Sequence, residues 1–231
     1  MQQAALNLIA IGIFCMTLSV LLGPILNIPP AIPAITTVGI LSLATLDTLS
    51  FQSKGVTLLL DWIAGAKGQY RDRILHHEAG HFLVAYLLGI PITGYTLTAW
   101  EAFKENKTGL GGVTFDTQEL SPDPLAAGEV RLTLERFCTV WMAGIAAETL
   151  VYDSAEGGAE DRQKLREALT SLGLPSNQYP IKERWATRQA QEMIEKNFSA
   201  YEALVEAMKQ RASVAECSEV IAYRLSTKGS A

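Results

Sequence analysis

The sequence predicts a mainly helical α+β protein, with an N-terminal transmembrane helical hairpin followed by a mostly helical domain that contains one small β-hairpin. Three observations support this prediction. Residues 1–46 carry no charged side chain, and apolar residues recur at helical spacing through most of the chain after residue 70. A stretch between residues 92 and 117 is instead rich in β-branched and aromatic residues. We expect a hairpin at 1–52, a linker helix at 53–70 and a domain at 71–231.

The first apolar run, Ala4 to Ile28, is long enough to cross about 30 Å of hydrocarbon as a helix. The alternatives are a buried core helix and a cleaved signal peptide, and the lack of a basic residue before the run argues against the signal peptide. The second run, Ala34 to Phe51, is shorter and contains hydroxyl side chains and Asp47, so an interfacial or core helix is the alternative. Basic residues begin at Lys54, which places both ends of the hairpin on the cytoplasmic or stromal side. We therefore expect an integral protein of a thylakoid or plasma membrane, in contact with the lipid bilayer.

Composition excludes several classes of function. The net charge is −5 and the Lys and Arg residues form no dense run, so nucleic acid is not an expected partner. The three cysteines are scattered, which predicts neither a disulfide framework nor a thiolate zinc site. No G-x-x-x-x-G-K-[ST] loop occurs, so no ATP-binding module is expected in this chain.

The central motif is H-E-A-G-H, on a helix expected to begin near Asp72 and to end near Pro91. His77 and His81 are four residues apart and therefore lie on one face of that helix. At this spacing two imidazoles can share one zinc ion while Glu78, between them, points at the open position of the metal. An unliganded pair of core histidines is the alternative. His76 points about 100° away and is not expected to be a ligand.

A β-hairpin is expected next, from strands at Ile92–Trp100 and Gly111–Thr117 with Glu101–Leu110 as the loop. It either covers the helix or offers an edge to an extended peptide. Helices are then expected at Leu132–Tyr152, Arg162–Ser171 and Ile181–Arg211. The small residues of the first of these helices should pack closely on Gly80; they are Ala143, Gly144, Ala146 and Ala147.

A catalytic zinc site needs three protein ligands, and no histidine remains for the third. Spacing does not choose among the downstream candidates, which are Glu148, Glu156, Glu160, Asp161 and Cys138.

Three segments together resemble the peptidase domain of the FtsH-type zinc metalloproteases: H-E-A-G-H, the A-G-I-A-A-E-T-L of residues 143–150, and the G-G-A-E-D of residues 157–161. The resemblance covers residues 72–220 and implies that Asp161, at the position of the family's third ligand, completes the zinc site with His77 and His81. Two departures are the lack of an ATPase module and Ile145 in place of the family's arginine. The chain therefore looks like the small FtsH-like peptidases without an AAA module known from chloroplasts and cyanobacteria.

The expected function is that of a membrane-anchored, ATP-independent zinc metalloendopeptidase with Glu78 as general base. Its substrates would be unfolded, membrane or membrane-associated proteins, and a homo-oligomer or a partner ATPase would be compatible with the sequence. Two alternatives remain. One is a proteolytically inactive membrane scaffold or assembly factor that keeps the peptidase fold, and the other is a zinc hydrolase that acts on a non-peptide amide.

Overall fold

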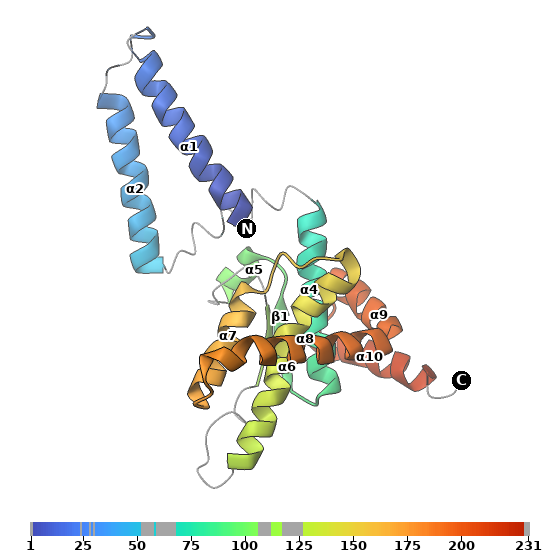
Figure 1. Cartoon of the computed structure of the whole chain (residues 1–231). Helices are drawn as coiled ribbons and strands as arrows, with labels where there is room; N and C mark the ends of the chain where they lie inside the picture. Colours follow the sequence, from blue (N-terminus) through green and yellow to red (C-terminus); the bar gives the residue numbers. More distant parts are fainter. Residues whose placement is uncertain are drawn as a thin grey trace. The chain divides into compact units, whose positions relative to one another are not determined.

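A computed structural model of the chain is shown in Figure 1. It describes residues 2–23, 25–27, 29, 31–51, 58, 68–105, 112–116 and 127–228. These residues form two compact units. The first comprises Met1–Tyr70 with Thr98–Gly111, and the second comprises Arg71–Leu97 with Gly112–Ala231.

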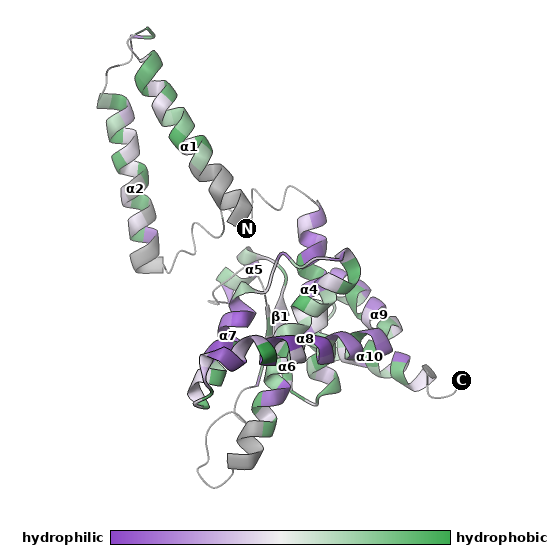
Figure 2. Cartoon of the chain, viewed as in Figure 1, coloured by the Kyte–Doolittle hydropathy of each residue, from purple (hydrophilic) through white to green (hydrophobic). Residues whose placement is uncertain are grey.

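The first unit contains the helices α1 (Gln2–Leu22), α2 (Ala31–Phe51) and α5 (Ala99–Lys104). Helices α1 and α2 form a hairpin in which the hydroxyl of Thr37 donates to Sδ of Met16 at 3.0 Å. Most of the described surface of both helices is hydrophobic (Figure 2), and large side chains such as Ile11 and Ile35 are exposed.

The structure does not support the predicted transmembrane hairpin. Among the described residues, none of the helices joins sufficient length to sufficient apolarity for a membrane crossing. A span needs about 20 consecutive and mostly apolar residues. Helix α2 is interrupted by several hydroxyl side chains and by Asp47. The prediction of two spans is therefore wrong, and so is the integral membrane location that followed from it.

The strand predicted at Ile92–Trp100 is shorter than expected, because its last residues enter helix α5. Thr98 is the N-cap of that helix, and its side chain accepts a hydrogen bond from the backbone N–H of Glu101 at 3.1 Å. A hydroxyl at the N-cap satisfies a backbone donor that the helix itself leaves unpaired. The predicted linker helix lies mostly outside the described residues, as do residues 106–110 of the predicted loop.

The second unit is mostly helical with one two-stranded antiparallel sheet, as predicted. Strand pairing follows the register Tyr95↔Val113 and Thr96↔Gly112. In chain order its elements are α4 (Gly68–Leu87), β1 (Ile92–Thr96), β2 (Gly112–Phe115), α6 (Ala127–Tyr152), α7 (Ala159–Ser171), η2 (Ser176–Gln178), α8 (Tyr179–Lys196), α9 (Phe198–Lys209) and α10 (Val214–Lys228).

Helix α4 is the buried centre of this unit, and its second half is enclosed by the other helices. Ala79, Phe82 and Leu83 are fully buried. A Cβ built on Gly80 would lie 2.6 Å from both the carbonyl oxygen of Ala143 and Cβ of Ala147. The prediction that the small-residue helix packs against Gly80 is thus confirmed, and this close approach brings α6 alongside the two histidines of the motif.

The long helix predicted at Ile181–Arg211 is two helices, α8 and α9, which meet at Asn197. Asn197 has a non-helical φ of −120°, and its side-chain amide donates to the carbonyl of Met193 at 2.9 Å. The break lets both helices bury an apolar face, with Ile194 on one side and Tyr201 on the other. Helix α10 was not predicted.

Candidate metal centre

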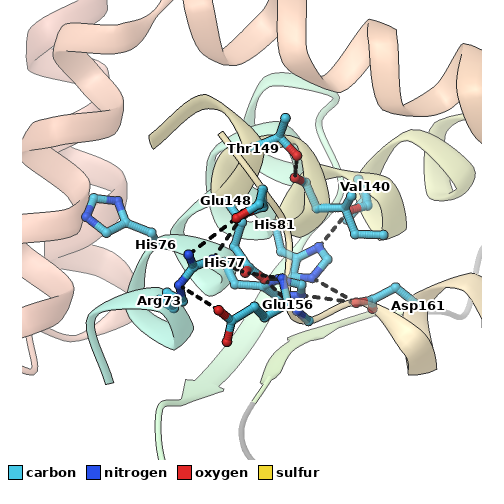
Figure 3. A network of polar contacts seen from close by, with 12 residues as sticks. Arg73, His76, His77, His81, Val140, Glu148, Thr149, Glu156 and Asp161 are labelled. Carbon is cyan, nitrogen blue, oxygen red and sulfur yellow. Dashed lines mark hydrogen bonds and ion pairs between the residues drawn. The ribbon is translucent and has the colours of Figure 1, made fainter. Parts of the chain in front are cut away.

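The imidazoles of His77 and His81 stand one turn apart on α4, with ring centroids separated by 4.7 Å. Each ring is held through Nδ1: that of His77 bonds Oε1 of Glu148 at 2.7 Å, and that of His81 bonds the carbonyl of Val140 at 2.7 Å. Because Nδ1 is engaged on both rings, both Nε2 atoms turn inward. They converge on Oδ2 of Asp161, at 3.1 Å from His77 and 3.6 Å from His81 (Figure 3).

Asp161 lies in the first turn of α7, which follows a short loop at the end of α6. The loop ends at Gly158, whose φ of +87° is a left-handed conformation that glycine adopts without strain. One ligand atom from each of His77, His81 and Asp161 lies within 4.8 Å of the others, and all three residues are buried. This group could hold a metal ion.

The other candidates for the third ligand lie elsewhere. Glu148 is buried but contacts His77 from the Nδ1 side, away from the point where the Nε2 atoms converge. Glu156 is exposed and pairs with Arg73, while Glu160 is exposed on α7. Cys138 belongs to a separate apolar cluster formed by α6, α7 and α8. Within the described part of the chain, only Asp161 joins the two histidines.

Two glycines make room for the His77 ring. A Cβ on Gly144 of α6 would overlap the imidazole, 2.5 Å from Cε1 and closer still to Nε2 and Cδ2. A Cβ on Gly157 would lie 3.1 Å from Nδ1 of the same ring and 2.6 Å from Oε1 of Glu148. The ring therefore sits between two backbone segments that approach it from different elements, which leaves it little freedom to reorient.

Without a bound metal, the electrostatics of the group are those of a buried imidazolium between carboxylates. Burial lowers the pKa of His77, but hydrogen bonds to Asp161 and Glu148 outweigh burial and raise it to about 10. Burial acts to raise the pKa of Asp161, and the charges and hydrogen bonds of His81 and His77 hold it well below its usual range. The pKa of Glu148 is also lowered: burial opposes this, but the bond to His77 and the N–H groups of Glu156 and Gly157 prevail. A metal ion would replace the proton shared at the centre of this group.

Glu78, the expected general base, is buried on α4 beside the group, where the charges of His77, His81 and Asp161 all act on it. Its Oε2 accepts a hydrogen bond from the backbone N–H of Val113 in β2 at 3.0 Å. Burial raises the pKa of Glu78. A carboxylate with a raised pKa is a better proton acceptor at neutral pH than an exposed one.

Sequence reasoning missed the residues that orient the ligands. Glu148 was considered as a ligand and instead fixes the ring of His77, while the Val140 carbonyl does the same for His81. Arg73 was not considered, although it precedes His77 by one helical turn and contacts Glu148. The i, i+4 spacing of Arg73 and His77 shows from the sequence that both lie on one face of the helix, but not that Arg73 contacts Glu148.

His76 bonds a different element and stays outside the metal group. Its Nδ1 lies 2.8 Å from the hydroxyl of Tyr201 on α9, and that hydroxyl donates to the carbonyl of His76 at 3.0 Å. This pair of bonds fastens α9 to α4 just before the motif.

Searches against protein families and against curated proteins found no match to the chain.

Proposed function

We propose that this protein is a zinc-dependent endopeptidase of the FtsH type that works without an ATPase module in its own chain. The single observation that supports the proposal is the convergence of His77, His81 and Asp161 beside the buried carboxylate of Glu78. A purely structural cluster would have no use for a fourth ionisable group at this position.

The donor set fits zinc. Two imidazole nitrogens and one carboxylate oxygen are a ligand set found in catalytic zinc sites, where three protein ligands leave one position open. Calcium and magnesium prefer sites made of oxygen ligands, so His77 and His81 disfavour them. When bound, zinc would supply Lewis acidity for a scissile carbonyl and for the attacking water.

The protein's own groups would bind, orient and move protons. The Nδ1 contacts to Glu148 and Val140 select the tautomer that leaves each Nε2 lone pair available to a metal. Glu78 would accept the proton of the attacking water and deliver it to the leaving amine. The N–H of Val113 holds Oε2 of Glu78 at 3.0 Å and so fixes the orientation of this carboxylate.

The position of β2 supports a peptide as the substrate. Its residue Val113 donates its backbone N–H toward Glu78, so the edge of β2 that faces away from β1 lies at the candidate metal centre. Since Glu78 already accepts the N–H of Val113, an extended polypeptide would pair with other backbone groups along this edge. Unfolded proteins are therefore the proposed substrate class.

The test compares Glu78→Gln with wild type for zinc content and for cleavage of casein. Glu78→Gln keeps the shape of the side chain, so it should retain zinc and lose chelator-sensitive proteolysis by a factor of about 100 or more. Glu160→Gln removes an exposed glutamate near the site and serves as the matched control, which should leave both unchanged. Full activity in Glu78→Gln would refute its role as the base.

His77→Ala tests the metal. The variant should lose its zinc, and unchanged zinc content by elemental analysis would contradict the ligand assignment. Wild type that binds zinc but cleaves neither casein nor other unfolded proteins would instead favour the inactive scaffold.

A further inference from the structure

Arg73 lies on α4 one turn before His77, and its guanidinium contacts both α6 and the loop that follows it. Nη1 donates to the backbone carbonyl of Ser154 at 3.0 Å and lies 3.4 Å from Oε2 of Glu148. The guanidinium carbon stands 4.4 Å from the ring centroid of Tyr152, at the end of α6, and Nε is 3.6 Å from the carboxylate of Glu156. Its side chain is 12% exposed, so these contacts are largely shielded from water.

Glu148, the partner of Arg73, is a buried carboxylate whose Oε1 lies 2.7 Å from Nδ1 of His77. Its side chain is 3% exposed, and a buried charge is costly unless another charge compensates it. A metal-bound imidazole carries no positive charge of its own, so with metal present His77 offers Glu148 only an N–H. Among the described residues that contact Glu148, Arg73 is then the cation that remains.

The same two residues also fix the loop that leads to Asp161. Glu148 accepts hydrogen bonds from the backbone N–H groups of Glu156 at 2.9 Å and of Gly157 at 3.2 Å, and Arg73 donates to the carbonyl of Ser154. Because Gly157 is packed against the ring of His77, any shift of this loop moves one ligand directly and the start of α7 with it. Arg73 is therefore connected to two of the three ligands through one carboxylate and one loop.

We propose that Arg73 is a positioning residue of the metal centre, which acts through Glu148 and residues 154–157 to hold His77 and Asp161 in the arrangement that binds zinc. The inference depends on the zinc site of the proposed function, but not on proteolysis. It predicts that the charge of Arg73 contributes to metal affinity although the side chain touches no metal ligand directly.

The experiment measures zinc affinity by chelator competition for wild type, Arg73→Met and Arg73→Lys. Arg73→Met keeps most of the apolar stem and loses the charge, and it should weaken zinc binding about 10- to 100-fold, as loss of an outer-shell partner does. Arg73→Lys keeps the charge and should restore most of the affinity. Arg188→Met is the matched control: Arg188 forms an exposed ion pair with Glu192 on α8, at 3.1 Å, and its loss should leave zinc affinity unchanged.

A double-mutant cycle separates this role from general loosening of the fold. Glu148→Gln removes the carboxylate charge through which Arg73 acts, so Arg73→Met should cost much less affinity in that background than in wild type. The absorption spectrum of the cobalt-substituted protein should change in Arg73→Met and return toward wild type in Arg73→Lys. If circular dichroism shows that Arg73→Met does not fold, Arg73→Gln takes its place in the cycle.

The outcomes distinguish this inference from the proposed function. Three results would each refute the positioning role of Arg73. They are wild-type zinc affinity in Arg73→Met, equal losses of affinity in Arg73→Met and Arg73→Lys, and additive losses in the double-mutant cycle. Wild-type protein that binds no zinc would refute the proposed function itself.

Discussion

Gly144→Ala is the sharpest test of the geometry at His77. The added methyl group would occupy the space of the imidazole, 2.5 Å from Cε1 and nearer to Nε2. The ring cannot simply turn away, because Nδ1 is bonded to Glu148 at 2.7 Å and the backbone of Gly157 closes its other side. We therefore expect the methyl group to push Nε2 away from Oδ2 of Asp161.

The two consequences of this substitution differ in size. Overpacking costs about 1–3 kcal/mol, while alanine in place of glycine inside a helix returns about 1 kcal/mol, so the metal-free protein should lose only about 0–2 kcal/mol of stability. Zinc affinity should fall by at least about 100-fold, or about 2.7 kcal/mol. This is the upper end of the loss caused by changing a residue that only orients a ligand, and in Gly144→Ala the ligand itself moves.

The assay combines denaturant unfolding in the presence of a chelator with zinc titration against a competing chelator. Gly39→Ala is the matched control, since a Cβ on this glycine of α2 meets nothing within 4 Å among the described residues. It should leave zinc affinity unchanged. Zinc affinity within about threefold of wild type in Gly144→Ala would refute the argument that His77 is confined between two backbone segments.

The protonation of His77 and the hydroxyl of Tyr201 can each be tested by a separate measurement. The pKa of His77 rises from 6.5 to about 10 on folding without metal, so its contribution to stability is complete below pH 6.5 and is lost as the pH approaches 10. The free energy of unfolding of the metal-free protein should therefore fall between pH 6.5 and 10. Zinc binding requires loss of the His77 proton, so zinc affinity should rise about tenfold per pH unit over the same range. A zinc affinity that does not change with pH would contradict the assignment of His77 as a ligand. Tyr201→Phe removes the hydroxyl that bonds Nδ1 and the carbonyl of His76, and should lower the free energy of unfolding by about 1–2 kcal/mol. Zinc titration of this variant should give the wild-type affinity, and a large loss would show that His76 contributes to the metal centre.

The N-terminal region shows how far composition can mislead. The lack of charge in residues 1–46 predicted two membrane spans, but a span depends on an unbroken length of apolar helix, which the described residues do not provide. At Thr98, by contrast, the sequence held a helix N-cap signal that was not recognised. β-Branched residues favoured a longer strand, while the hydroxyl of Thr98 capped a helix.

The sequence by itself determined the features that depend on neighbours along the chain. The spacing of His77 and His81 places both imidazoles on one helix face, and glycine at position 80 indicates close packing, because each of these follows from the geometry of a single helix. Asp161 is 84 residues from His77, and spacing could not distinguish it from Glu148; only the resemblance favoured it. The tertiary structure brought it to the two Nε2 atoms and assigned Glu148 to the opposite nitrogen of His77. Which carboxylate meets which ring atom depends on how α6 packs on α4 and on where the loop before α7 lies, and neither is encoded in the periodicity of any one element.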